Sequence, residues 1–249
     1  MTLKDLDSSH SIGLVDCGAG VSRGSAFIVS HNGIEYIVTD CHVLYKIQKD
    51  RSIVPHDNYV NITFHGQHTY PSSALTASFE LSKVKKKVSA DLDLAVIAID
   101  DAVTFENEGS CPLNPIPVDS DSLELWGKRT YMLGFPTSLF PAKPFTFKPF
   151  LATGIVSSVD DVESLFVVDV PSFYGNSGSP VFLDKGDGDV VLCGIVQRLI
   201  TFNLKWGNPY ESTISRIDWH NSGYTICRSV NSIKALIENE NSFKSESES

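Results

Sequence analysis

The sequence predicts an all-β protein. Its apolar runs are short, roughly five to eight residues, and turn signals separate them. The chain has 17 glycines and 12 prolines among 249 residues, a composition typical of many strands joined by tight turns rather than of alternating strands and helices. A hydrophobic content of 42% is enough for a sizeable core, and the length suits two packed β-barrels.

The first predicted strands form a hairpin that leads to a histidine. Apolar runs cover 24–30 and 36–43, and Asn32-Gly33 between them is a typical hairpin turn. His42 is the one histidine among seven that ends such a run. A histidine held at the end of a buried hairpin can act as a general base, although a single histidine more often has a structural role.

An aspartate leads into the next buried strand. Asp93 directly precedes the apolar run 94–99, whereas Asp91 lies further out and is expected to be solvated. A partly desolvated carboxylate must be paired or hydrogen-bonded, for example to an imidazole N–H. The alternative is an acid that caps a surface strand.

The most informative motif is Gly175-Asn176-Ser177-Gly178-Ser179-Pro180. Glycines on both sides can hold Ser177 in a tight turn, with its hydroxyl exposed and neighbouring N–H groups converging on one point. Acyl transfer requires this, because its tetrahedral intermediate carries an oxyanion. Such clusters are also common in ordinary turns. The order His42, Asp93, Ser177 nevertheless supplies a base, a group that orients it and a nucleophile.

These motifs resemble those of the chymotrypsin-like (trypsin-fold) serine proteases, nearest to the bacterial glutamyl endopeptidase and Deg-type branches. The resemblance covers nearly the whole chain from about residue 12. The segments similar to family motifs are 24–29 (G-S-G-F-I-I in the family), 39–43 (T-x-x-H-V), 93–96 (D-[LI]-A-V), 175–182 (G-N-S-G-S-P-V-F), and two second-barrel strands at 131–136 and 152–157.

The resemblance implies a single trypsin-like peptidase domain over 1–249, built from two six-stranded antiparallel β-barrels and a short C-terminal helix. The first barrel would cover about 12–118 and the second about 122–228, with a crossover at 114–121 and the catalytic cleft between them. The helix is expected at 229–240, where apolar residues recur at helical spacing, and a disordered polar tail at 241–249.

The same resemblance implies the catalytic roles. Ser177 would attack the scissile carbonyl, His42 would transfer its proton, and Asp93 would orient the imidazole. The N–H groups of Gly175 and Ser177 would form the oxyanion hole. No metal or cofactor is expected.

The resemblance also places a specificity pocket. Its base would lie at Pro171 and Ser172, and its wall at Val196, Gln197 and Arg198. No aspartate occupies the base, so a preference for Lys or Arg is not expected. Val196 stands where the glutamyl branch has a histidine, and we expect an uncharged, small-to-medium residue before the scissile bond.

Regulation by cleavage of the trypsinogen kind is not expected. In those zymogens the new N-terminus pairs with an aspartate just before the nucleophile, and here that position is Asn176. The enzyme is therefore expected to be constitutively shaped, or gated by a regulatory protein partner.

Charge and cysteine content indicate which partners and which cellular compartment to expect. The net charge of −10 disfavours nucleic acid and anionic membranes as partners. The resemblance to serine proteases implies a protein or peptide substrate. The lysine cluster at 83–87 is expected in a loop or an edge strand. Five cysteines cannot all pair, none has metal-ligand spacing, and no leader-like or membrane-spanning apolar run is visible. We expect a cytoplasmic protein with reduced thiols.

Taken together, these features predict a serine endopeptidase. The alternative is a catalytically silent trypsin-fold module that binds peptides or proteins. An esterase built on a nucleophile elbow is disfavoured, because the residues after Ser179 continue as a strand rather than a helix.

Overall fold

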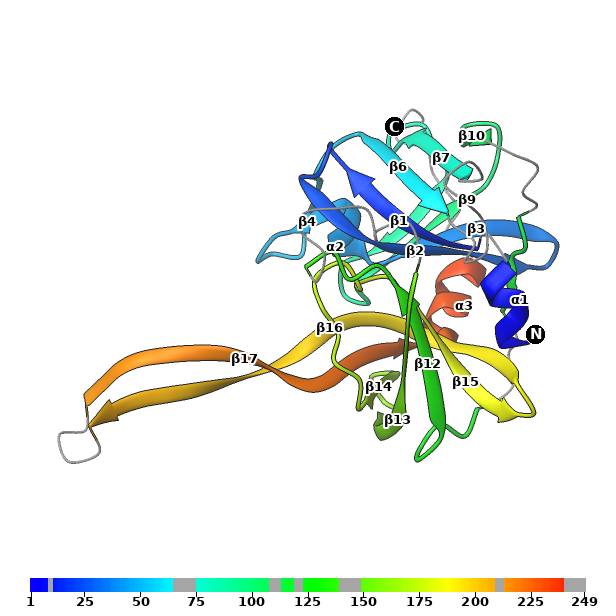
Figure 1. Cartoon of the computed structure of the whole chain (residues 1–249). Coiled ribbons are helices and arrows are strands. Elements are labelled where there is room, and N and C mark those ends of the chain that lie inside the picture. The colour runs from blue at the N-terminus through cyan, green and yellow to red at the C-terminus, as the bar shows by residue number, and fades with distance from the viewer. Residues whose placement is uncertain are drawn as a thin grey trace.

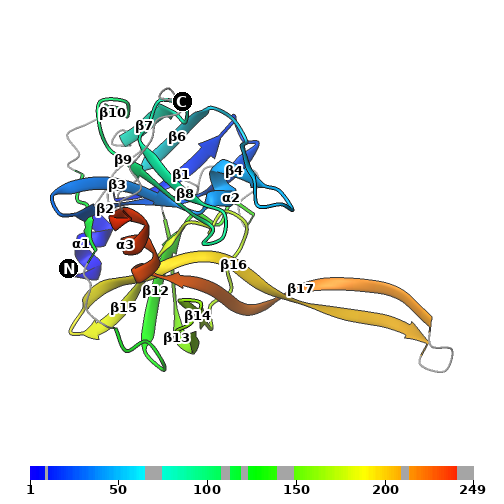
Figure 2. The ribbon, with the colours of Figure 1, turned by 180° about the vertical axis from the view of Figure 1, so that it is seen from behind.

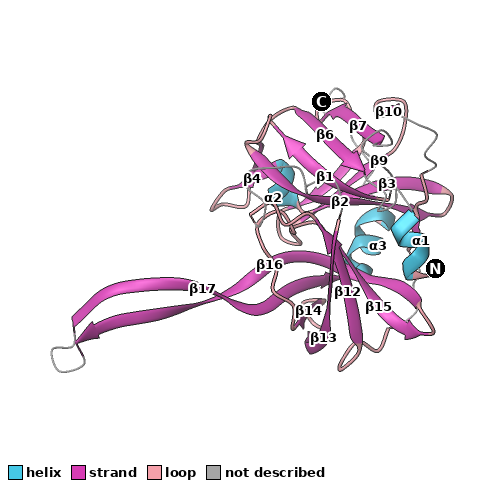
Figure 3. Ribbon diagram, in the orientation of Figure 1, coloured by secondary structure: helices cyan, strands magenta, loops and turns pink. Residues whose placement is uncertain are grey.

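A computed structural model of the chain describes residues 1–8, 11–64, 75–107, 113–118, 123–138, 149–208 and 213–239. Strands dominate it, in two large sheets that lie one above the other in Figure 1. Figure 3 shows the few helices beside them. The all-β class and the trypsin-like arrangement of two β units are confirmed.

The first unit is a curled nine-stranded sheet. Its strands follow the order β10-β7-β6-β1-β2-β3-β9-β8, and β11 pairs with β2 in parallel. Their bounds are β1 (Ile12–Cys17), β2 (Ser22–His31), β3 (Ile34–Thr39), β6 (Tyr59–Phe64), β7 (Leu75–Glu80), β8 (Lys86–Ser89), β9 (Leu94–Ala98), β10 (Thr104–Asn107) and β11 (Ile116–Pro117). A separate pair is formed by β4 (Tyr45–Ile47) and β5 (Ile53–Pro55).

This unit has more strands than the six predicted, and its described strands do not close into a ring. The extra strands are short and lack long apolar runs: β8 reads Lys-Lys-Val-Ser and β10 reads Thr-Phe-Glu-Asn. Pattern reading does not detect such segments, because pairing with a neighbouring strand, rather than their own hydrophobicity, makes them strands.

The second unit is a closed six-stranded barrel, as predicted, with the order β12-β13-β14-β17-β16-β15. Its strands are β12 (Arg129–Gly134), β13 (Phe150–Asp160), β14 (Leu165–Val168), β15 (Pro180–Gly186), β16 (Asp189–Asn208) and β17 (Thr213–Ser229). The last two continue beyond the barrel as a long two-stranded arm, which projects from the body in Figures 1 and 2.

Three apolar clusters hold the units together. One fills the first sheet, one fills the barrel, and the third lies between them. Strand β2 shows how this arises: Ala26 and Ile28 face the first cluster, and Phe27 and Val29 face the third, because successive side chains point to opposite faces.

The predicted hairpin turn is confirmed and the predicted end of its second strand is corrected. Asn32 and Gly33 both have positive φ angles, +50° and +78°, as a type I′ turn requires. Strand β3 ends at Thr39, however, and His42 lies in a one-turn helix, α2 (Cys41–Leu44), rather than in the strand. Four residues are too few to show helical periodicity in the sequence.

The remaining helices tie the termini to the body. Helix α1 is Leu3–Ser8, and α3 is Val230–Glu238, within the predicted 229–240. Ser229 caps α3 through its hydroxyl, and the helix buries Val230, Ile233 and Ile237 in the cluster between the units. The predicted tail at 241–249 lies outside the described residues.

The lysine cluster lies in a loop and an edge strand, as expected: Lys86 and Lys87 belong to β8, the last strand of the first sheet, and Lys83 and Lys85 lie in the loop before it. Lys87 also reaches across to α3, where its Nζ donates to the carbonyls of Ile237 (2.8 Å) and Asn239 (2.5 Å). A cation at the C-terminal end of a helix is favoured by the helix dipole. Within the described part of the chain, no helix is long and apolar enough to cross a membrane.

Candidate active site

The two β units bring the three predicted catalytic residues together. His42 follows β3 and Asp93 directly precedes β9, and these strands are antiparallel neighbours, with Thr39 opposite Ala95. The two side chains therefore meet at one end of the strand pair. Ser177 lies in the turn before β15 of the barrel.

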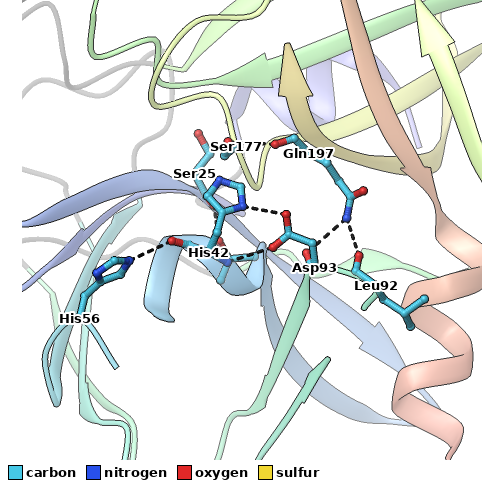
Figure 4. A network of polar contacts seen from close by, with 8 residues as sticks. Ser25, His42, His56, Leu92, Asp93, Ser177 and Gln197 are labelled. Carbon is cyan, nitrogen blue, oxygen red and sulfur yellow. Dashed lines mark hydrogen bonds and ion pairs between the residues drawn. The ribbon is translucent and has the colours of Figure 1, made fainter. Parts of the chain in front are cut away.

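Asp93 holds His42 at two points (Figure 4). The imidazole Nδ1 donates to Asp93 Oδ2 at 2.8 Å, and the backbone N–H of His42 donates to Oδ1 at 3.0 Å. A carboxylate only accepts, so Nδ1 carries a proton, and in the neutral imidazole Nε2 keeps the free lone pair. Asp93 has a positive φ of +52°, a conformation that Asp adopts more readily than most residues.

The turn around Ser177 depends on two glycines. Gly175 and Gly178 have φ angles of +97° and +85°, and a Cβ on either would lie within 2.2 Å of a backbone oxygen. The turn is closed by Asn176 N–H donating to Phe173 O at 3.0 Å. Among the described residues, the N–H groups of Gly175 and Ser177 donate to no backbone carbonyl, so both predicted oxyanion-hole donors are available.

Ser25, which the sequence did not single out, fastens this turn to the first sheet. Its N–H donates to Ser177 O at 2.7 Å, and its hydroxyl donates to Gly175 O at 2.8 Å. The same hydroxyl accepts from Phe135 N–H at 3.1 Å. The sequence feature that could have indicated this role is a serine within the buried strand Gly-Ser-Ala-Phe, because a buried hydroxyl needs hydrogen-bond partners.

Gln197 links Ser177 to the turn that carries Asp93. Its side-chain Nε2 donates to the carbonyls of Leu92 (2.5 Å) and Asp93 (3.3 Å), and its own carbonyl accepts from Ser177 Oγ at 3.1 Å. Gln197 was predicted as a wall of the specificity pocket, but its side chain is buried and turned toward the Asp93 turn. In the described structure Ser177 Oγ makes no hydrogen bond to His42, so it must rotate before it can give up its proton.

The other predicted pocket residues differ in exposure. Pro171 and Arg198 are exposed, and Ser172 is buried, with its carbonyl accepting from Asn221 Nδ2 at 2.7 Å. Val196 packs its side chain in the barrel core, and its backbone N–H and carbonyl bind Ser179 and Gly178. Of this set, Arg198 is the charged side chain that faces solvent.

Asp40 is a buried acid beside the site that the sequence did not flag. It is fully buried, and within the described ranges neither carboxylate oxygen meets the geometry of a hydrogen bond. Burial raises the pKa of Asp40 well above its ordinary value, and the nearby His42 opposes that rise. Burial would lower the pKa of His42, but the hydrogen bond to Asp93 and the charges of Asp40 and Asp93 raise it to about 9.

These shifts predict how activity depends on pH. Only neutral His42 can accept a proton, so kcat/KM should rise with pH as His42 deprotonates. The midpoint of this rising limb of the pH–rate profile should lie above the ordinary pKa of a histidine. Asp40→Asn removes the negative charge that Asp40 carries at pH values above its own raised pKa, and that charge stabilises the imidazolium. We expect it to move this limb to lower pH. A pH–rate profile measures this, with exposed Asp91→Asn as the matched control; an unmoved limb would contradict the role given to Asp40.

Cys41, beside His42, is no nucleophile. Burial, with smaller contributions from Asp93 and Asp40, raises the pKa of its thiol to about 12, so it stays protonated at neutral pH. The described cysteines at 17, 41, 193 and 227 are buried and unpaired. No group of three His, Cys, Asp or Glu side chains in the described ranges is placed to hold a metal ion.

A model of the trypsin-like peptidase domain matches residues 24–191. The chain therefore belongs to the trypsin-like peptidase family, and its fold is that of a serine protease. Comparison with curated protein sequences gave no match.

Solved structures of proteases share the fold over nearly the whole chain. Deg5 is 17% identical, with a TM-score of 0.55 over 94% of this chain and 91% of Deg5. A Glu endopeptidase in complex with MPD is 15% identical, with a TM-score of 0.57 over 95% and 94%. The protease Anisep from Arthrobacter nicotinovorans is 13% identical, with a TM-score of 0.54 over 93% and 96%.

Proposed function

We propose that the protein is a serine endopeptidase that hydrolyses peptide bonds through His42, Asp93 and Ser177 and an acyl-enzyme intermediate. The observation that carries this proposal is the two-point hydrogen bond between Asp93 and His42. In the neutral imidazole it selects the tautomer with the proton on Nδ1 and a free Nε2, which is the tautomer a general base needs.

The proposed reaction makes use of this geometry. Ser177 Oγ rotates away from Gln197 O toward His42 Nε2, loses its proton there and attacks the substrate carbonyl. The N–H groups of Gly175 and Ser177 receive the oxyanion, and each such donor is worth roughly 10²–10³ in rate. The imidazolium then protonates the leaving amine, and a water activated by His42 releases the acyl group from Ser177.

Covalent labelling tests the proposal directly. A biotinylated fluorophosphonate forms a stable bond only with an activated serine, so the native protein should be labelled. Labelling should vanish in Ser177→Ala and in His42→Ala, because loss of the nucleophile or the base costs about 10⁶-fold in the triad of subtilisin. Ser52→Ala, an exposed serine elsewhere, is the control.

Two results would contradict the proposal. One is a folded native protein that remains unlabelled, which would favour a silent peptide-binding module. The other is labelling that persists in Ser177→Ala, which would place the reactive serine elsewhere. A peptide library on a labelled enzyme would then define the residue preferred before the scissile bond.

A further inference from the structure

His56 lies directly after β5 and contacts α2, the one-turn helix that carries His42. Its imidazole Nε2 lies 3.1 Å from the carbonyl oxygen of His42, as Figure 4 shows. A carbonyl oxygen can only accept, so Nε2 carries a proton and donates the hydrogen bond. The backbone N–H of His56 also donates to the carbonyl of Leu44, the last residue of α2, at 2.9 Å. One residue therefore binds this helix at two points.

The carbonyl groups of α2 depend on partners outside the helix. The last four C=O groups of any helix have no partner within it, and α2 has only four residues. The backbone N–H of Tyr45 donates to Cys41 O, and His56 binds His42 O and Leu44 O. His56 thus supplies donors to two of the four carbonyls. A carbonyl removed from water without a donor costs free energy, so these two bonds help to fix how the helix lies.

The backbone of His42 is held at both of its polar groups. Its N–H donates to Asp93 Oδ1 at 3.0 Å, and its C=O accepts from His56. Asp93 comes from the turn before β9, 51 residues away, and His56 follows β5, 14 residues away. With both groups held, the Cα–Cβ bond has one direction, and Nδ1 of the imidazole meets Asp93 Oδ2 at 2.8 Å. Loss of the His56 bond would let α2 tilt, and the imidazole would move with it.

The small β4–β5 sheet places His56 for this role. The three residues of β4 pair with the three of β5 in an antiparallel register, and the bond from His56 N–H to Leu44 O continues this ladder by one residue toward α2. Register decides which residue faces the helix, because a slip of one residue turns every side chain to the other face. Ile47 and Ile53 also pack against the apolar cluster that fills the first sheet. The pair is thereby anchored to the unit that carries Asp93.

We propose that His56 is a positioning residue for the catalytic base: its Nε2–H, bound to the carbonyl of His42, keeps the imidazole of His42 where it can receive the proton of Ser177. The inference rests on the proposed peptidase function, in which His42 is that base. His56 acts only through the backbone of His42 and transfers no proton itself. The bond therefore matters for the chemical step and much less for the binding of substrate.

Three substitutions test the hydrogen bond itself. His56→Phe keeps an aromatic ring and His56→Met keeps a side chain of similar length, and neither has a donor, whereas His56→Gln keeps an Nε2 donor at a similar reach. The Phe and Met variants should lower kcat for a nitrophenyl ester about 10- to 100-fold and change KM little, because a misplacement of about 1 Å can cost about 10²-fold. The Gln variant should keep most of the activity.

The matched control removes a similar bond elsewhere. His31→Phe loses the 3.0 Å contact between His31 Nε2 and Glu238 Oε1 of α3, away from α2, and should keep the native rate. Thermal unfolding of each variant shows whether it is folded; if His56→Phe is not, the comparison of Met with Gln decides. Equal losses in the Met and Gln variants, or no loss in either donor-free variant, would overturn the proposal.

NMR on Ser177→Ala distinguishes failure of this role from failure of the catalytic proposal, because it requires no turnover. The Nδ1–H proton of His42, bonded to Asp93, should resonate far downfield, and the pKa of His42 should be raised, toward about 9. Adding His56→Phe or His56→Met should move the signal upfield and lower the pKa, since a displaced imidazole loses part of its bond to Asp93. Asp40 and Asp93, the carboxylates whose charges act on His42, are unchanged in each variant.

The two readouts separate the possible outcomes. An unchanged signal and pKa in the donor-free variants would overturn the positioning role of His56, whatever the activity of the native protein. A signal that moves as expected, in a chain whose native form hydrolyses nothing and is not labelled, would support that role and refute the serine endopeptidase.

Discussion

Asp93→Asn is expected to lower kcat by about 10⁴, the loss that the same change causes in the triad of trypsin. The reason lies in the two hydrogen bonds that Asp93 accepts. The backbone N–H of His42 can only donate, so the new amide must place its oxygen there and its NH₂ against Nδ1. The imidazole is then protonated on Nε2 and cannot accept a proton from Ser177.

The backbone at this position tolerates the change, because Asn, like Asp, adopts the positive φ of +52° that Asp93 has. Asp91→Asn is the matched control: its side chain is 82% exposed and lies 3.7 Å from Arg51, on the surface. Ester or peptide hydrolysis and the rate of fluorophosphonate labelling measure the effect. Retention of more than a tenth of the activity by Asp93→Asn, or an equal loss in Asp91→Asn, would show that the acid has been misassigned.

Gly178→Ala is expected to destabilise the protein and to abolish labelling. The new Cβ would lie 1.9 Å from Ser25 O and 2.6 Å from Thr39 Oγ1, at a φ of +85°. Backbone strain and overpacking together cost about 2 to 6 kcal/mol of unfolding free energy. The turn can relieve the contact only by moving away from β2, which would displace Ser177.

Gly188→Ala separates the effect of the steric contact made by a new Cβ from the effect of the positive φ. Gly188 has nearly the same φ, +84°, but a Cβ there would have no atom within 4 Å. It should cost only about 1 to 2 kcal/mol, the strain of a left-handed residue, and leave labelling intact. Thermal unfolding of both variants beside labelling gives the comparison. Equal losses of stability would mean that the positive φ, and not the packing of the Ser177 turn on β2, governs both sites.

The parts of the site that the sequence predicted are those in which a functional group and its backbone conformation both depend on residues close to it in the sequence. Glycines around Ser177 and the Asn32-Gly33 turn need positive φ angles, and few other residues supply them. Asp93 precedes an apolar run, so its need for a partner is visible in the sequence. Each signal lies within a few residues of the group it concerns.

The parts that were missed depend on contacts between distant segments. Gln197 reaches the Asp93 turn across 104 residues, and Ser25 reaches Gly175 across 150. No local pattern records such pairs. The alternation of Phe202, Leu204 and Trp206 is visible in the sequence, but a period of two describes a buried barrel strand equally well, so the projecting arm could not be predicted from it.

The bonds of Ser25 have a consequence for the order in which the protein matures. The serine turn belongs to the second unit, yet it is held in shape by a strand of the first, through Ser177 O and Gly175 O. A chain whose C-terminal half had folded alone would present the serine on an unsupported loop, away from its base. The proposed hydrolytic activity would therefore require both halves to have docked.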